Sequence, residues 1–151
     1  MNFSREPNVG KQTTYFEPPD IIFLKLRGHC TTEEGNEVNR RHLEWALDLP
    51  NVYFLIDLAE LQRIDADVRK LATETLARLP LRGMIGFSAP LKAKVIATLI
   101  FTAINLFAKK ADKIPLKFVD TEEEARDWIE RRRQELLQQA KPALGGAAHG
   151  R

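Results

Sequence analysis

Four carboxylates cluster in the middle of the sequence, where an apolar run ends. Asp57 follows the apolar residues 53–56, and Glu60, Asp65 and Asp67 come soon after it. Carboxylate oxygens at such spacing could bind a divalent cation. Helix capping and loop solvation explain the same residues with fewer requirements, because Asp65 directly precedes an apolar series at helical spacing. We therefore predict a polar turn that begins a helix, and no metal site.

The histidines and the cysteine give weaker chemical signals. His42 falls in an apolar helical stripe and has no second histidine or cysteine at metal-ligand spacing, so we interpret it as a packed histidine. His29 and Cys30 are adjacent at a strand end, where neighbouring side chains point to opposite faces and do not meet. Cys30 is the only cysteine, so it forms no intrachain disulfide. With no nucleophile elbow and no phosphate-binding glycine loop, the sequence predicts a non-enzymatic protein without a cofactor.

The composition is that of one globular domain. The chain has 151 residues, of which 44% are hydrophobic and 29% charged, with a formal net charge of +2. This small charge does not indicate nucleic-acid binding. Arg131, Arg132 and Arg133 could contact phosphates, but glutamates flank them on an expected surface helix, where i,i+4 ion pairs account for them. The N-terminus lacks the apolar core of a signal peptide, so we predict a cytoplasmic protein.

Apolar periodicity predicts strands and helices that alternate after an opening antiparallel hairpin. Capping boxes at Thr31 with Glu34 and at Thr121 with Glu124 mark two helix starts. The expected order is ββαβαβαβα, which describes a single α/β domain with a mixed, mostly parallel sheet and helices mainly on one face. The predicted divisions are a flexible N-terminus (1–12), the folded domain (13–139) and a disordered tail (140–151).

The helix expected at 91–110 is apolar over most of its circumference. Thr98, Thr102 and Asn105 form one narrow polar stripe, and lysines flank the segment. One sheet covers only one side of a helix, so a deep core position, a dimer surface, an apolar ligand cavity and a membrane surface all remain open. The apolar segment is too short to cross a bilayer. The candidate ligand or membrane contacts are Ile96, Leu99, Ile100, Phe101, Ile104, Phe107, Lys94, Lys109 and Lys110.

Three segments of the sequence resemble a known family. These are LKLRGHCTTEE, FLIDLAEL and KFVDTEEEARDWI, and over about residues 20–131 they resemble the SpoIIAA-like branch of the STAS superfamily. Members of that superfamily that act as anti-sigma-factor antagonists carry a phosphorylatable serine in the turn after the central strand. The matching turn is Asp65, Ala66, Asp67, Val68, in which Ala66 has no hydroxyl. The likeness of this branch to lipid-carrying SEC14-type folds implies an apolar ligand or membrane association.

Two hypotheses follow. The first is a non-enzymatic STAS-like module that binds an apolar ligand or a membrane surface through the helix at 91–110. The second is a protein-interaction regulator of the anti-sigma-factor-antagonist type that lacks the phosphorylatable serine. In the second hypothesis the partner meets Asp57, Asp65, Ala66 and Asp67. A homodimer is compatible with both.

Overall fold

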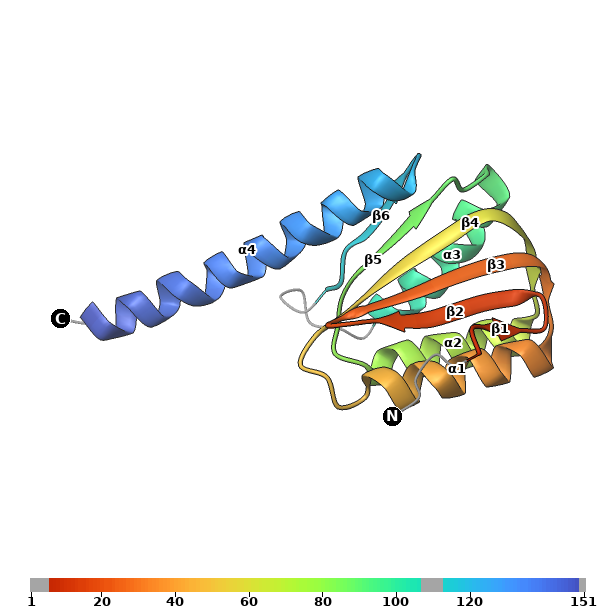
Figure 1. Cartoon of the computed structure of the whole chain (residues 1–151), viewed down its shortest axis with the longest axis horizontal. Coiled ribbons are helices and arrows are strands. Elements are labelled where there is room, and N and C mark those ends of the chain that lie inside the picture. Colours follow the sequence, from red (N-terminus) through yellow and green to blue (C-terminus); the bar gives the residue numbers. More distant parts are fainter. Residues whose placement is uncertain (1–5, 107–112, 150–151) are drawn as a thin grey trace.

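A single mixed sheet organises the chain. The computed structural model describes residues 6–106 and 113–149, with side chains up to residue 139. The six strands lie in the order of the sequence (Figure 1). The first three pair with one another antiparallel, and the third to the sixth pair parallel. They are β1 (Asn8–Val9), β2 (Gln12–Glu17), β3 (Ile21–Cys30), β4 (Val52–Ile64), β5 (Leu81–Phe87) and β6 (Leu116–Val119). This arrangement confirms the predicted fold class.

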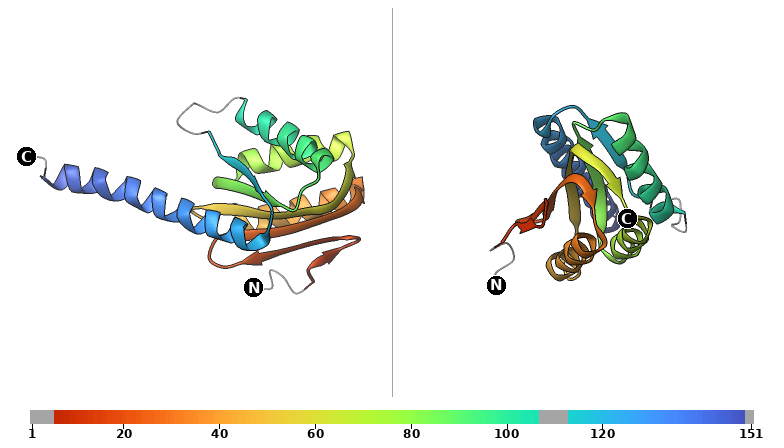
Figure 2. Two further views of the ribbon diagram at one scale, coloured as in Figure 1. Left: turned by 90° about the horizontal axis from the view of Figure 1, so that it is seen from above. Right: turned by 90° about the vertical axis from the view of Figure 1, so that its right-hand side faces the viewer.

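Helices cover both faces of the sheet, but unequally. Three of them, α1 (Thr32–Ala46), α2 (Ala66–Arg78) and α3 (Leu91–Asn105), lie together on one face, and α4 (Glu122–His149) crosses the other (Figure 2). Consecutive parallel strands are neighbours in the sheet, so right-handed crossovers place their helices on the same side. The structure thus confirms helices mainly on one face.

Two elements lie in segments for which the sequence predicts little order. The short strand β1 falls within residues 1–12, the expected flexible N-terminus. Helix α4 continues to His149, through most of the expected disordered tail at 140–151. Figure 1 shows this helix extending well past the edge of the sheet.

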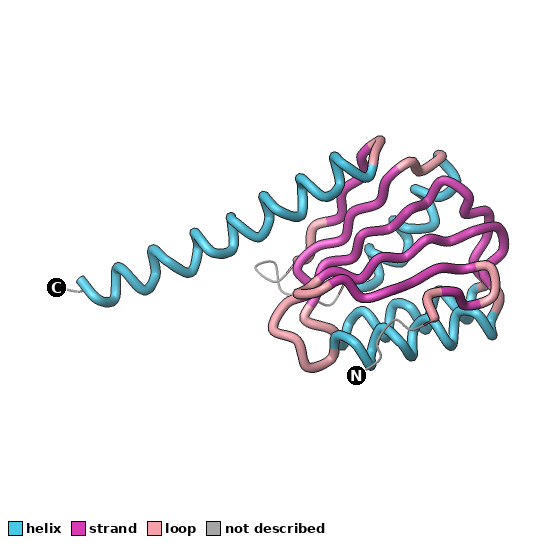
Figure 3. Tube along the Cα trace, in the orientation of Figure 1, coloured by secondary structure: helices cyan, strands magenta, loops and turns pink. Residues whose placement is uncertain are grey.

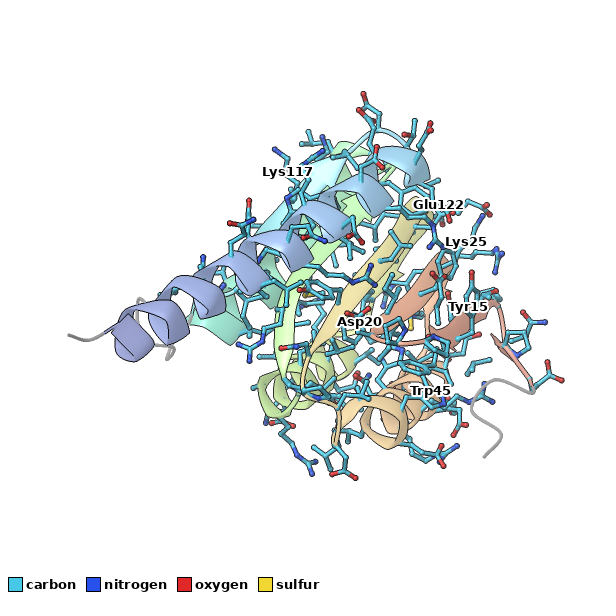
Figure 4. The ribbon with its side chains drawn as sticks, turned by 60° about the vertical axis from the view of Figure 1, so that its left-hand side comes forward. Tyr15, Asp20, Lys25, Trp45, Lys117 and Glu122 are labelled. Atoms are coloured by element: carbon cyan, nitrogen blue, oxygen red, sulfur yellow. The ribbon has the colours of Figure 1, made fainter. Side chains whose placement is uncertain are left out.

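The central strand β4 is apolar on both faces because both are covered. Phe54 and Ile56 belong to the core under α1, α2 and α3, whereas Tyr53 and Leu55 belong to the core under α4. This alternation produces the continuous apolar run seen in the sequence. Helix α4 crosses in front of the strands in Figure 4.

Two ion pairs fasten α4 to the hairpin of β2 and β3. The Arg126 guanidinium donates to both carboxylate oxygens of Glu17, at 2.7 and 3.0 Å. Seven residues further along α4, Arg133 makes a bidentate contact with Asp20, which lies in the turn between β2 and β3 and is labelled in Figure 4. Arg133 therefore has a structural role in holding α4 against the sheet.

Candidate functional site

The strand before the candidate site is longer than predicted. The sequence suggests that the apolar run ends at Asp57 and gives way to a turn, but β4 continues to Ile64. After Asp57 pairs with Phe87, β4 leaves β5 and stays paired with β3, bending at the right-hand edge of Figure 3. Register shifts in this half bring Leu58, Leu61 and Ile64 to the buried face at intervals of three. A strand is recognised in a sequence by apolar residues at every second position, and this three-residue spacing does not match that pattern.

The extension splits the predicted acidic group into two. Asp57 and Glu60 lie within the strand, where both bind the Lys25 ammonium, at 3.4 and 3.1 Å. The hydrogen bond to Glu60 and the charge of Asp57 raise the pKa of Lys25. Lys25, together with Arg27 at 4.0 Å from Glu60, balances the charges of these two carboxylates. Asp57 stands eight residues before Asp65. The prediction that Asp57 belongs to the turn is therefore wrong.

The start of α2 gathers the remaining candidates. His29, near the end of β3, lies with its Nε2 2.7 Å from Oδ1 of Asp65, and Arg63 donates to the same oxygen at 3.3 Å. Thr32, in the first turn of α1, donates its hydroxyl to Oδ2 of Asp67 at 2.9 Å. The hydrogen bond from His29 is the main cause that lowers the pKa of Asp65.

We call this set the α2 turn surface. Ala66 and Asp67 are exposed, and Asp65 is half-buried. Two parallel strands and two helix starts meet at this edge, the position where open α/β sheets commonly bind ligands. The surface comprises His29, Thr32, Asp65, Ala66 and Asp67. Sequence reasoning found the last three residues and missed the first two, because their contacts join positions more than thirty residues apart.

A carboxylate beneath this surface joins the β1–β2 turn to α1. Glu34 completes the predicted capping box with Thr31 and also accepts hydrogen bonds from the backbone N–H of Lys11, at 2.9 Å, and from Nε2 of Gln12, at 3.0 Å. Burial alone would raise the Glu34 pKa, but these donors lower it to about 2. Gly10 allows the close approach, since a Cβ there would lie 2.2 Å from a Glu34 oxygen.

Helix α3 presents a different set of side chains to solvent from the one proposed. Phe101 and Ile104 are buried, and Ile96 and Ile100 are half-buried. Of the predicted contact residues, Leu99 and Lys94 are exposed, whereas Phe107, Lys109 and Lys110 lie outside the described residues. The exposed apolar side chains along this helix and at its end are Leu91, Val95, Leu99 and Leu106, which we call the α3 stripe.

The polar stripe predicted on this helix divides into two roles. Thr98 and Thr102 are exposed beside the α3 stripe. Asn105 instead holds the chain that follows the helix, because its side-chain amide exchanges two hydrogen bonds of 3.0 Å with the backbone of Ile114.

An apolar cavity of about 90 Å³ lies between the sheet and the helices α1, α2 and α3. The half-buried residues Ile96, Ala97 and Ile100 form its α3 wall, and Met84 and Phe118 contribute from the sheet. Helix α3 is therefore cavity-lining on its inner side and exposed on its outer side.

Burial favours the neutral forms of His42 and Cys30. His42 Nε2 lies 2.8 Å from the Thr14 hydroxyl, which donates to the Phe23 carbonyl, so the histidine is the donor. Burial, with a smaller effect from Arg41, lowers the His42 pKa to about 3, and burial raises that of Cys30 to about 11. Within the described residues, no three side chains are grouped to hold a metal ion, and no helix could span a membrane.

This architecture defines the SpoIIAA-like class of α/β folds, as the sequence resemblance predicts. One similar structure is that of the anti-sigma factor antagonist SpoIIAA in its unphosphorylated form, with a TM-score of 0.56 and 11% identity over 79% of this chain and 96% of that one. Another is a DUF3478-family protein from Shewanella loihica PV-4 with a SpoIIAA-like fold, with a TM-score of 0.55 and 16% identity over 78% of this chain and 90% of that one. The sequence matches no protein-family model and no curated protein. At these identities the likeness establishes the fold.

Proposed function

We propose that this protein is a non-enzymatic interaction module of the anti-sigma-factor-antagonist type, which binds a partner protein through the α2 turn surface. The observation that carries the proposal is the pair of side-chain links, His29 with Asp65 and Thr32 with Asp67, that hold this surface in one geometry. A surface already ordered before binding loses less conformational entropy when a partner docks. The similar SpoIIAA structure, described as an anti-sigma factor antagonist, supports the same reading.

The chemistry of the surface indicates the kind of partner. Asp67 is exposed, and the described α2 turn surface offers carboxylates together with a hydroxyl. Such groups fit a partner segment that carries arginine or lysine side chains. Ala66 has no hydroxyl, so a phosphate cannot be added at that position of the turn.

A charge-reversal experiment tests this proposal. The partner is captured from a bacterial lysate, purified and titrated against wild type and the Asp65→Lys, Asp67→Lys variant, which should bind at least ten-fold more weakly. The matched control reverses two exposed carboxylates on α4, Glu123→Lys and Asp127→Lys, and should bind as wild type does. Thermal melts confirm that both variants fold. Equal affinity of the two variants would remove the α2 turn surface from the proposal.

The α3 stripe favours a second candidate function, docking on an anionic membrane or an apolar ligand. Contiguous exposed apolar side chains on one helix mark an interaction site more often than scattered ones. Lys92 and Lys94 at the start of the helix and Lys113 beyond its end are exposed and suited to anionic headgroups. The apolar cavity behind the same helix could take a small apolar molecule.

Vesicle co-sedimentation tests this second function. The protein should sediment with vesicles of phosphatidylcholine and phosphatidylglycerol but not with phosphatidylcholine alone. Leu99→Asp should abolish sedimentation, whereas Leu137→Asp on α4, a residue of similar exposure (61% against 58%), should leave it intact. Absence of wild-type binding to either vesicle would exclude the membrane role.

A further inference from the structure

The residue that begins α2 does not cap it. Asp65 occupies the N-cap position, with extended backbone angles, but its side chain makes no capping hydrogen bond. Aspartate at this position ordinarily accepts a hydrogen bond from the backbone N–H two or three residues later. In this structure the carboxylate is turned toward β3, where its Oδ1 lies 2.7 Å from Nε2 of His29. The first turn of α2 therefore loses a capping acceptor to a side chain on another element.

The two arrangements of Asp65 compete. A carboxylate bound to His29 ties the end of β3 to the end of β4, and a carboxylate turned inward would accept from the N–H of Asp67 or Val68. The N–H of Val68 is already engaged by Oδ1 of Asp67 at 3.0 Å. A rotation of the Asp65 side chain would add a cap without unfolding any element, so the two states are close in structure.

The charge of an imidazole changes the strength of a hydrogen bond such as the one that holds Asp65. A protonated imidazole binds a carboxylate by a charge-assisted hydrogen bond, which is stronger than the bond from a neutral ring. Of the other charged groups, Arg63 donates to the same Asp65 oxygen. Asp67 and Arg69 stand in the first turns of α2 with contacts to Thr32 and to the Ile64 carbonyl, and Glu34 and Lys11 act on the neighbouring Cys30. Carboxylates, arginines and lysines ordinarily keep their charge between about pH 5 and pH 8, whereas histidine is the side-chain type whose charge ordinarily changes in that range.

We infer that His29 and Asp65 form a pH-sensitive device that sets the capping state of α2. At low pH the protonated histidine holds the carboxylate away from the helix. At higher pH the carboxylate turns to cap the first turn. The geometry on which the proposed function depends is the state in which His29 holds Asp65, so the consequence for a partner rests on that function. The device itself is a property of the helix.

Amide exchange measured by NMR tests the device without a partner. Hydrogen exchange at Asp67, whose N–H the turned carboxylate would bind, should slow by about five-fold from pH 5 to pH 8 after correction for its intrinsic pH dependence, the factor expected for an N-cap. The midpoint should coincide with the titration of the His29 ring protons. Failure of partner binding would not change this result, so the two proposals fail separately.

Variants of the histidine separate the device from general pH effects. His29→Gln should hold the slow exchange at every pH, and His29→Arg should hold the fast exchange. His149→Gln, at the far end of α4, should behave as wild type and is the matched control. Thermal melts establish that each variant is folded. A midpoint that persists in His29→Gln, or no response of the Asp67 amide between about pH 5 and pH 8 in the wild type, would overturn the inference.

Discussion

Glu34 should make the stability of this protein depend on pH in a way that one substitution removes. Its carboxylate accepts hydrogen bonds from the β1–β2 turn and from the start of α1, and its pKa is lowered from 4.5 to about 2. Glu34→Gln retains the size of the side chain but removes the charge. The variant should therefore be less stable at neutral pH.

The magnitude follows from linkage. A pKa that falls from 4.5 to about 2 corresponds to at most about 3 kcal/mol at neutral pH. The site is near the surface, where the Lys11 side chain is 51% exposed, so solvent screening reduces the expected loss to about 1–2 kcal/mol. Because the folded-state pKa is depressed, this stabilisation is complete above pH 4.5 and is lost as the pH falls toward 2.

Urea unfolding followed by circular dichroism at about pH 7, 5, 4 and 3 measures the effect. The difference between wild type and Glu34→Gln should shrink steadily as the pH falls. Glu37, whose pKa is also lowered to about 2, is common to both proteins and cancels in the difference. Glu33→Gln, an exposed carboxylate in the same turn, should change stability by less than about 0.5 kcal/mol. A gap that stays constant from neutral to acid pH would refute the charge argument.

Three further substitutions or reactions test the packing. Gly35→Ala should destabilise the protein by about 1–3 kcal/mol in urea unfolding, because its Cβ would lie 2.5 Å from Val68 where α1 crosses α2; a neutral result would show that the helices can separate. Ile129 lies on the side of α4 that packs against the sheet and is 1% exposed, so Ile129→Ala should lower the free energy of unfolding by about 2–5 kcal/mol. Leu137→Ala on the same helix should lower it by less than about 0.5 kcal/mol, and equal losses would contradict the docking of α4. Cys30 is buried with its pKa raised to about 11, so iodoacetamide should label it in denaturant and very slowly in the native protein, as mass spectrometry would show; rapid native labelling would mean that the β3 end opens.

Local signals in the sequence were sufficient for most element starts. Both predicted capping boxes are present, with hydrogen bonds between Thr31 and Glu34 and between Thr121 and Glu124. A capping box depends on residues three apart, so its chemistry is visible in a short window. The same holds for the apolar run of β4, whose two faces are each covered by helices.

The sequence predicted three of the five residues of the α2 turn surface and not the other two. Asp65, Ala66 and Asp67 stand together in the sequence, but His29 and Thr32 reach them through the parallel pairing of β3 with β4. The register shifts in that pairing also explain why the second half of β4 escaped prediction. Partners that come from different elements leave no local pattern.

Amino-acid order by itself determined most of the strands and helices and how they succeed one another, though not β1, the second half of β4 or the far end of α4. It also determined that the helix beginning at Leu91 has more apolar surface than one sheet can cover. Tertiary structure decided which side of that helix is buried: Phe101 and Ile104 face the core, and Leu91, Val95 and Leu99 face solvent. A helix that is apolar nearly all round carries no periodic preference for one face. Its orientation is therefore set by the neighbours that α2 and the sheet supply, and these exist only once the chain has folded.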